Sequence, residues 1–271
     1  MRRNSVYFLL LCSDMENRLF GEVVFGPVKS RRLGLSLGIN ILPADKKICS
    51  FNCIYCECGW NTSGPGLSFV PRDIVAKEME TRFSSAAVTR ESIDVITFAG
   101  NGEPTLHPDF SGIIEDTLRL RDQYLPGIPV AVLSNSTMLF NEEVRNALLK
   151  CDMPILKLDS AIESTCRLLN QPTGYFNLRN TIEQLKQFEG RCIIQTMFVR
   201  GQYNQQAFDN TTPEELQALI QAIKAIAPSY VMIYTIDRDT PAEQIQRISA
   251  EELKRIAAII RSEGIEVNIS D

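Results

Sequence analysis

Short apolar runs alternate with amphipathic stretches along the chain from about residue 36 onward. The apolar runs are rich in Val and Ile, as buried parallel strands are, and they span residues 35–42, 94–99, 129–134, 155–159, 192–199, 230–236 and 266–269. The intervening stretches have helical spacing and span residues 71–84, 109–123, 141–150, 162–169, 178–188, 213–226 and 250–263. This alternation predicts an α/β fold in which helices connect the strands of a parallel sheet.

The ends of the predicted helices carry capping residues. Thr212 stands at an N-cap before Pro213. Ser249 begins a capping box with Glu252, and Gly264 ends the last helix. Six or seven strand–helix units favour a partial, open (β/α)6 TIM-like barrel over a complete eightfold barrel. In such folds the reacting groups lie at the carboxyl ends of the strands.

The chain is expected to form one domain. Its 271 residues suit a single α/β barrel, and 44% hydrophobic residues are enough for a sizeable core. No internal repeat, low-complexity tract or interdomain linker interrupts the pattern. We expect residues 1–35 to pack on the barrel as an N-terminal extension and residues 36–271 to form the barrel.

The N-terminus faintly resembles a secretory signal, with two arginines before an apolar run that ends at Cys12. The run is at the short limit for a signal, no small-residue cleavage site follows it, and the residues before Cys12 are too large for a lipoprotein site. The plainer interpretation is that Met15 is the true start. No apolar stretch approaches the length of a membrane span. We therefore expect a cytoplasmic protein without a membrane segment.

Three cysteines lie in the loop after the first predicted barrel strand. Cys49, Cys53 and Cys56 are separated by three and by two residues. Three thiolates can occupy three irons of a [4Fe–4S] cluster and leave the fourth iron open for chemistry. Cys58 is interpreted as a bystander or as a redox-labile thiol near the cluster. The eight cysteines of the chain do not have the pattern of a disulfide framework.

A structural zinc site is the competing interpretation of these cysteines. Zinc usually takes four ligands, commonly from two separated CxxC pairs. Here Cys58 is the only further cysteine nearby, no second pair exists, and the single histidine, His107, is distant in sequence. An iron–sulfur cluster is therefore favoured.

A second motif follows the predicted strand 94–99. Gly102 allows a sharp turn and close approach to a ligand, and Pro104 fixes the direction in which the chain leaves. Between them, Glu103 offers a carboxylate that could pair with the ammonium group of a ligand. By itself the segment would also suit an ordinary strand–helix turn, but beside the cysteine loop a binding role is favoured.

Together the two motifs resemble the radical S-adenosylmethionine (radical SAM) superfamily. The resemblance rests on CxxxCxxC with an aromatic residue before the last cysteine, and on the Gly-Glu-Pro turn after the next strand. It covers about residues 22–269. It implies a partial barrel of the radical SAM type that binds one [4Fe–4S] cluster through Cys49, Cys53 and Cys56. The amino and carboxylate groups of S-adenosylmethionine would chelate the open iron.

The resemblance also implies a reaction and further site residues. Tyr55 would pack near the adenine, and the turn Gly102-Glu103-Pro104 would meet the amino group of S-adenosylmethionine. An electron from an external donor of the flavodoxin or ferredoxin type would cleave the S–C5′ bond reductively. The resulting 5′-deoxyadenosyl radical would abstract hydrogen from a substrate that the sequence does not identify.

Polar residues near later strand ends add candidates for cofactor binding. In the family, the region that contains Ser134 and Asn135 contacts the ribose and the methionyl carboxylate, although such residues also serve as turns and helix caps. Lys157 and Asp159 share one side of an apolar strand, so that either one lines the pocket or the two pair with each other. Gln195 needs a partner, which is a ligand hydroxyl or a neighbouring backbone group.

A pair of arginines precedes the first barrel strand. Arg31 and Arg32 stand between glycines, and they could bind a phosphate or carboxylate or form a solvated pair. Arg238, after the sixth strand, could clamp an anionic substrate or be held by the aspartates beside it.

Two longer segments resemble the branch that contains the wybutosine-synthesising tRNA enzymes. These segments are GPVKSRRLGLSLGIN before the cysteines and YTIDRDTP after the sixth strand. The sequence departs from that branch, because we find in it no upstream set of cysteines for a second cluster and expect no flavodoxin-like or large RNA-binding addition. With a net charge of −5, a nucleic-acid substrate is compatible with the sequence but not favoured. The alternative function is a non-catalytic iron–sulfur electron-transfer or scaffold protein.

Overall fold

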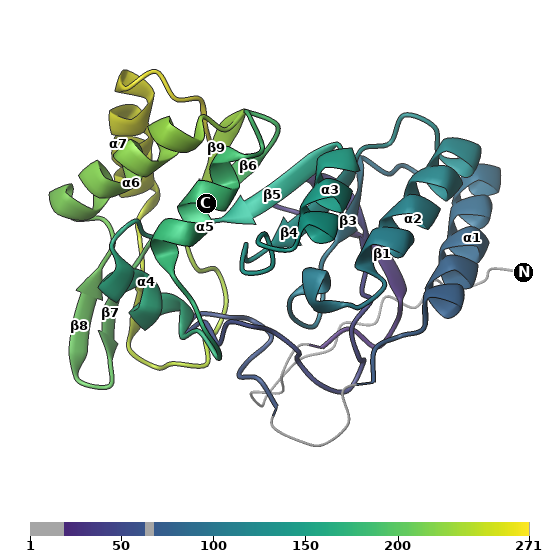
Figure 1. Ribbon diagram of the computed structural model, residues 1–271, viewed down its shortest axis with the longest axis horizontal. Helices are drawn as coiled ribbons and strands as arrows, with labels where there is room; N and C mark the ends of the chain where they lie inside the picture. The colour runs from purple at the N-terminus through teal and green to yellow at the C-terminus, as the bar shows by residue number, and fades with distance from the viewer. Residues whose placement is uncertain (1–18, 63–67, 271) are drawn as a thin grey trace, which may run out of the picture.

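The computed structural model describes residues 19–62 and 68–270 (Figure 1). The expected start at Met15 and the apolar run before Cys12 lie outside these residues. No helix in the described ranges is long and apolar enough to cross a membrane.

One curled sheet of eight strands forms the centre of the molecule, in the order β1-β2-β3-β4-β5-β6-β9-β11. Its parallel strands are β2 (Gly34–Ile39), β3 (Val95–Phe98), β4 (Val130–Ser134), β5 (Met153–Lys157), β6 (Ile193–Met197), β9 (Tyr230–Tyr234) and β11 (Val267–Ser270). Strand β1 (Val24–Ser30) pairs antiparallel with β2 at one edge. Strands that are neighbours in this sheet follow one another along the chain, apart from the strands of a smaller sheet between them, as is usual for strand–helix units.

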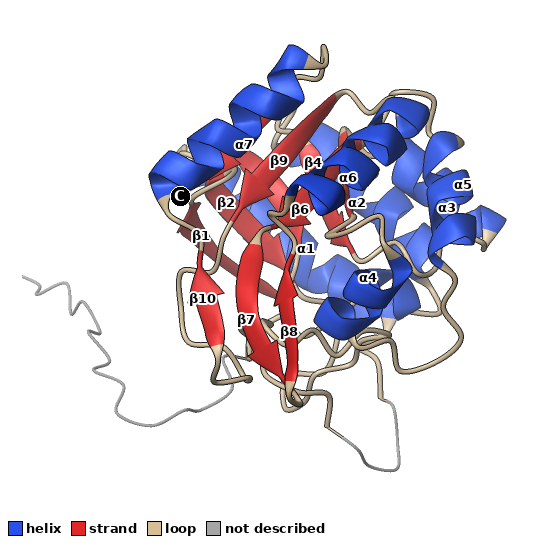
Figure 2. Cartoon of the chain, turned by 90° about the vertical axis from the view of Figure 1, so that its left-hand side faces the viewer, coloured by secondary structure: helices blue, strands red, loops and turns tan. Residues whose placement is uncertain are grey.

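Helices cover the outer face of the sheet (Figures 1 and 2). They are α1 (Arg72–Thr89), α2 (Phe110–Tyr124), α3 (Glu142–Lys150), α4 (Glu163–Asn170), α5 (Leu178–Lys186), α6 (Pro213–Ile226) and α7 (Ala250–Ser262). Each parallel strand from β2 to β9 is followed by at least one helix, and β11 comes last. The predicted partial (β/α)6 barrel is therefore confirmed. The expected caps also form, because the hydroxyls of Thr212 and Ser249 accept hydrogen bonds from the first turns of α6 and α7.

The two faces of the curled sheet have separate cores. On the outer face, strand residues such as Leu37 and Ile194 belong to the main core together with helix residues such as Met79. On the inner face, a smaller cluster contains strand residues only: Val95, Ala131, Ile155, Ile193 and Met232. Leu33, from the turn between β1 and β2, packs against this inner cluster. The inner cluster therefore fills part of the barrel interior, as side chains do in complete TIM barrels.

A second, smaller sheet was not predicted from the sequence. Its order is β10-β7-β8, with β7 (Val199–Tyr203), β8 (Gln206–Asp209) and β10 (Ile245–Arg247) all antiparallel (Figure 2). The apolar run at 192–199 therefore divides into β6 and the start of β7. Asn204 and Gln205, which join β7 to β8, both have positive φ, at 48° and 64°. Two such residues match the preferred two-residue hairpin turn, but this pair lacks the glycine that usually marks it.

Two boundaries near the N-terminus and in α1 also differ from the sequence pattern. Residues 24–30 form β1, whose register shifts between Phe25 and Val28, where glycine and proline interrupt the strand pattern. The position of the boundary between extension and barrel stays a prediction. Helix α1 continues to Thr89 instead of ending at residue 84. The Ser84 hydroxyl donates to the carbonyl of Thr81 inside the helix, so this serine does not end it.

Candidate active site

The cysteine loop lies between β2 and α1 and is fastened on two sides. On one side, Ile48 donates to the carbonyl of Asn101 at 2.9 Å, and Glu103 donates to the carbonyl of Ile48 at 2.9 Å. On the other side, Ile54 donates to the carbonyl of Leu169 near the end of α4, at 3.0 Å. These backbone bonds hold the loop against the turn that follows β3 and against α4.

The turn after β3 approaches the cysteine loop so closely that it requires a glycine at position 102. Gly102 has a φ of +135°, and a Cβ there would collide with the carbonyl oxygen of Ile48. Only glycine combines this conformation with so close an approach. The turn after β3 and the cysteine loop are thus held backbone to backbone.

We expect Gly102→Ala to separate this turn from the cysteine loop. Backbone strain and the collision with Ile48 together should lower the free energy of unfolding by at least about 2 kcal/mol, and cluster binding should weaken. Gly174→Ala is the matched control, because a Cβ at Gly174 meets nothing within 4 Å. Denaturant unfolding and iron content of the two variants test this expectation, and equal values for both would contradict it.

The three predicted ligand thiols lie in the same loop, but their surroundings differ. Cys53 is buried, whereas Cys49 and Cys56 are partly exposed. Burial raises the pKa of Cys49 to about 12 and also raises that of Cys53. A hydrogen bond with Cys58 lowers the pKa of Cys56 to about 5, and Lys47 acts in the same direction. Across residues 19–62 and 68–270, no three His, Cys, Asp or Glu side chains are grouped so as to hold a single metal ion. A [4Fe–4S] cluster instead takes its three thiolates on three separate irons.

Lys47 is a buried cation beside the thiols, and sequence reasoning missed it. Its side chain is 3% exposed and donates to the carbonyl of Gly59 at 2.8 Å. Burial alone would lower the pKa of Lys47, but negative charge on Cys56, Cys49 and Cys53 raises it, with a hydrogen bond to Cys56. The signal was present in the sequence as a lysine pair just before the first cysteine, but nothing there showed that Lys47 turns inward.

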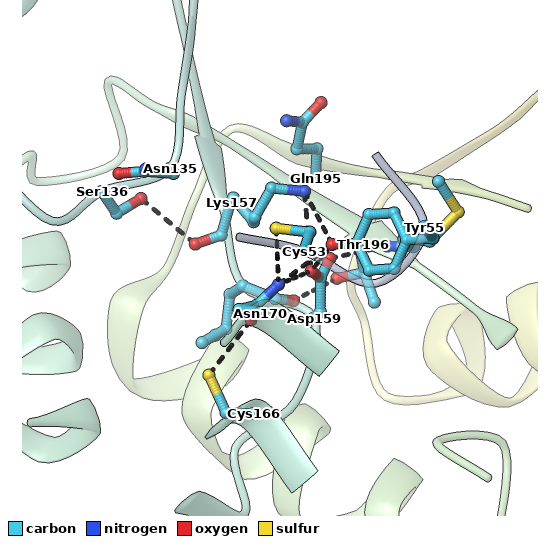
Figure 3. Close-up of polar contacts among 12 residues, drawn as sticks. Cys53, Tyr55, Asn135, Ser136, Lys157, Asp159, Cys166, Asn170, Gln195 and Thr196 are labelled. Carbon is cyan, nitrogen blue, oxygen red and sulfur yellow. Dashed lines mark hydrogen bonds and ion pairs between the residues drawn. The ribbon is translucent and has the colours of Figure 1, made fainter. Parts of the chain in front are cut away.

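Asp159 joins the cysteine loop to the barrel (Figure 3). The residue is 1% exposed, and its carboxylate accepts hydrogen bonds from the Tyr55 hydroxyl, from Asn170 Nδ2 at 2.7 Å and from the backbone N–H of Met197 at 2.9 Å. Lys157 Nζ lies 3.5 Å from the carboxylate and 3.0 Å from the Tyr55 hydroxyl. Lys157 and Asp159 therefore pair with each other. Burial alone would lower the pKa of Lys157, but the Asp159 carboxylate raises it.

Glu103 connects the loops that follow β3 and β4. One carboxylate oxygen accepts from the backbone N–H and hydroxyl of Thr105, at 3.1 Å and 2.5 Å. The other accepts from the backbone N–H of Asn135 at 2.6 Å, and the side chain of Ser134 also hydrogen-bonds the carboxylate. Burial raises the pKa of Glu103, although these hydrogen bonds oppose the shift. A carboxylate has about four acceptor positions, so the acceptor capacity of Glu103 is already used. Pro104 follows at the start of a short 3₁₀ helix, η1 (Pro104–Leu106).

Asn135 is the residue of the β4 loop that reaches the cysteines. Its Nδ2 donates to Ser50 Oγ at 2.9 Å and contacts Cys49 Sγ at 3.4 Å. Asn170 makes the corresponding 3.4 Å contact to Cys53 Sγ from the end of α4. The structure thus brings Asn135 to the cysteine loop. Gln195 was expected to bond a ligand hydroxyl or a neighbouring backbone group. In the structure its Oε1 accepts a hydrogen bond from Arg32 Nη1 at 2.6 Å.

Comparison with known proteins identifies the family. The Radical SAM superfamily matches residues 46–211, which is more than half of the chain and includes the cysteine loop, the turn after β3 and Asp159. The chain belongs to the radical SAM superfamily. As a radical SAM protein it is an enzyme, and the family implies a [4Fe–4S] cluster and S-adenosylmethionine as its cofactors.

Relatives in sequence cover most of this radical SAM chain. A protein named GTPase Obg from Brachyspira hyodysenteriae is 32% identical over 253 residues, which are 91% of this chain and 35% of that protein. A UPF0026 protein from Methanocaldococcus jannaschii is 32% identical over 243 residues, or 88% of this chain and 70% of that one. This chain therefore spans about a third of the first relative and more than two thirds of the second.

Solved structures resemble the radical SAM chain in fold. A radical SAM methyltransferase from Sphaerobacter thermophilus has a TM-score of 0.64 at 13% identity, covering 86% of this chain and 65% of the other. Streptococcus suis SuiB bound to S-adenosylmethionine has a TM-score of 0.59 at 15% identity, covering 86% and 49%. These similarities support the partial barrel.

The residues present in this radical SAM protein fit the cluster. The site offers three thiols from one loop, amide donors near two of the sulfurs, and the buried ammonium of Lys47. Cysteine-bound clusters carry negative charge that hydrogen-bond donors and cations stabilise. This set of neighbours therefore suits a [4Fe–4S] cluster in its chemistry.

Proposed function

We propose that the protein binds one [4Fe–4S] cluster through Cys49, Cys53 and Cys56 and uses S-adenosylmethionine to abstract hydrogen from a substrate. The observation that carries this proposal is the attachment of the cysteine loop to the Gly-Glu-Pro turn through the Ile48–Gly102 bridge. The cofactors would supply the 5′-deoxyadenosyl radical, and the barrel would orient the substrate and exclude water.

The side chains around the thiols would stabilise the bound cluster. Lys47 would offset negative charge at the three cysteines, because its buried ammonium lies beside them. Asn135 and Asn170 would direct N–H donors to the sulfurs of Cys49 and Cys53. Such donors orient ligands and tune the reduction potential of iron–sulfur clusters.

The residues expected to contact S-adenosylmethionine would divide into two groups. Glu103 would act by positioning, because its carboxylate already holds the β3 and β4 loops together, and Gly102 and Pro104 would shape the turn. Ser134 and Asn135 would face the cofactor from the β4 loop.

Tyr55, Asp159 and Gln195 stay predictions as contacts of the cofactor. The Tyr55 hydroxyl is already bound by Asp159, so contact with the adenine would use the ring. Asp159 would then position the Tyr55 ring through its hydrogen bond with the hydroxyl. The side-chain oxygen of Gln195 already accepts a hydrogen bond from Arg32.

The partners of the reaction are also proposed. An external flavodoxin- or ferredoxin-type protein would supply the electron, since three neighbouring cysteines account for one cluster. The wybutosine-like branch stays a prediction, and the net charge of −5 does not favour nucleic acid as the substrate. A non-catalytic iron–sulfur protein is the second candidate, and an open iron beside a Gly-Glu-Pro turn argues against it.

Anaerobic reconstitution with iron and sulfide tests the proposed function. We expect about four irons per chain and a brown chromophore. Reduction with dithionite should then release 5′-deoxyadenosine and methionine from added S-adenosylmethionine. Bound zinc without iron uptake would overturn the proposal, and iron uptake without cleavage would favour the non-catalytic candidate. Iron analysis and chromatography of the products are sufficient measurements.

A further inference from the structure

The inner face of the barrel changes from apolar to polar toward the carboxyl ends of the strands. Ile155, Ile193 and Met232 belong to the inner apolar cluster. Two positions farther along the same strands stand Lys157, Gln195 and Tyr234. Side chains two apart in a strand point to the same face, so these three residues form a polar layer above the cluster. Lys157 and Gln195 are direct neighbours in the β5–β6 register and lie side by side in Figure 3.

Arg32 enters this polar layer from the turn between β1 and β2. Its Nη1 donates to Gln195 Oε1 at 2.6 Å, and its Cζ lies 4.6 Å from the centre of the Tyr234 ring. Gln195 is 5% exposed and Tyr234 is 7% exposed. Two contacts on buried partners therefore fix the plane of the guanidinium. The adjacent Arg31 pairs instead with Asp237, 3.6 Å away and partly exposed.

The charge of Arg32 is not matched by a carboxylate. Among the described side chains, Arg32 forms no ion pair, because Asp237 pairs with Arg31 and Asp159 pairs with Lys157. Its Nε and Nη2 have no acceptor in the described part of the chain. Arg32 also acts on Lys157 as a like charge. Among the described residues, Arg32 thus keeps an open N–H edge, and a guanidinium presents such an edge to a carboxylate or phosphate in bidentate geometry.

We propose that Arg32, with Gln195 and Lys157 beside it, forms a subsite for a carboxylate or phosphate group of the substrate. The inference rests on the proposed function, because it takes the space between the inner cluster and the cysteine loop as the substrate chamber. The cysteine loop borders this layer directly, since Tyr55 Oη lies 3.0 Å from Lys157 Nζ. The anion would therefore fix one end of the substrate while another part reaches the cofactor.

Anion binding to the reconstituted holoenzyme tests the subsite. Inorganic phosphate and succinate are titrated separately by calorimetry in the presence of saturating S-adenosylmethionine. We expect at least one of them to bind wild type at one site per chain. Loss of the charge-assisted bonds in Arg32→Met should weaken binding by about 10- to 100-fold. Arg32→Lys should be intermediate because it keeps the charge without the fork, and Arg31→Met should bind as wild type does.

The alternative ligand of Arg32 is the methionyl carboxylate of S-adenosylmethionine. The affinity for S-adenosylmethionine is therefore measured for the same variants. Unchanged affinity in Arg32→Met, together with lost phosphate or succinate binding, supports a substrate subsite. Lower affinity for S-adenosylmethionine would overturn it, because Arg32 would then bind the cofactor.

Two further results would also overturn the subsite. The first is that wild type binds neither anion. The second is that wild type and Arg32→Met bind the anions equally. After either result, the only remaining role of Arg32 would be to hold the β1–β2 hairpin in place. Iron content and S-adenosylmethionine cleavage of wild type are measured first, so failure of the proposed function is seen separately. Circular dichroism confirms folding, and Arg32→Lys carries the comparison if Arg32→Met does not fold.

Discussion

Cys53→Ala is expected to abolish cluster assembly, whereas Cys58→Ala should leave the iron content unchanged. Cys53 is buried at the centre of the cysteine loop, and Asn170 donates toward its sulfur. Loss of this thiol would leave two ligands for a cluster that needs three. The Cys58 thiol is engaged differently, because it donates to the carbonyl of Gly100 at 3.3 Å and lies in hydrogen-bond contact with Cys56.

Iron analysis and the visible absorption spectrum after anaerobic reconstitution measure both variants. Iron should fall from about four per chain to near zero in Cys53→Ala. S-adenosylmethionine cleavage should disappear with it. Cys151→Ala is a suitable control, because this cysteine is buried far along the chain and its thiol bonds to the carbonyl of Ala147. If Cys58→Ala also lost its iron, four cysteines would hold the cluster. No iron would then be open to bind S-adenosylmethionine, which would contradict the proposed function.

The sequence was sufficient for the main sheet and for the cysteine loop because both are encoded locally. Runs of Val and Ile mark the buried parallel strands, and the cysteine spacing and the Gly102 turn lie within short segments. The helix caps at Thr212 and Ser249 are equally local. Each of these features depends on residues a few positions apart.

The contacts that complete the site depend on residues far apart in sequence. Arg32 and Gln195 are separated by 163 positions, and their alternative partners could not be distinguished from the sequence. From the sequence, Lys157 and Asp159 could either pair with each other or line the pocket. In the structure they pair, and Lys157 also contacts the buried Tyr55 hydroxyl. Lys47 was missed because its burial follows from the path of the whole loop. Tertiary packing sets such environments, and local propensity does not encode them.

Asp159→Ala is expected to be the most destabilising single substitution among the charged residues of the site. Removing the carboxylate would leave the Lys157 ammonium buried without a partner, and three donors would lose their acceptor. Breaking a buried ion pair on one side costs about 3–5 kcal/mol of unfolding free energy. Denaturant unfolding measures this loss. Asp237→Ala is the control, because its pairs with Arg31 and Arg247 are exposed and should contribute less than about 1 kcal/mol.

The double variant Asp159→Ala/Lys157→Met separates the charge from the hydrogen bonds. If the unpaired ammonium causes much of the loss, the double variant should be more stable than Asp159→Ala alone, because the buried charge is gone. It should remain less stable than wild type, since Tyr55, Asn170 and the N–H of Met197 still lack their acceptor. A double variant less stable than Asp159→Ala would show that Lys157 finds another partner, and the unpaired ammonium would then not be the cause of the loss in Asp159→Ala.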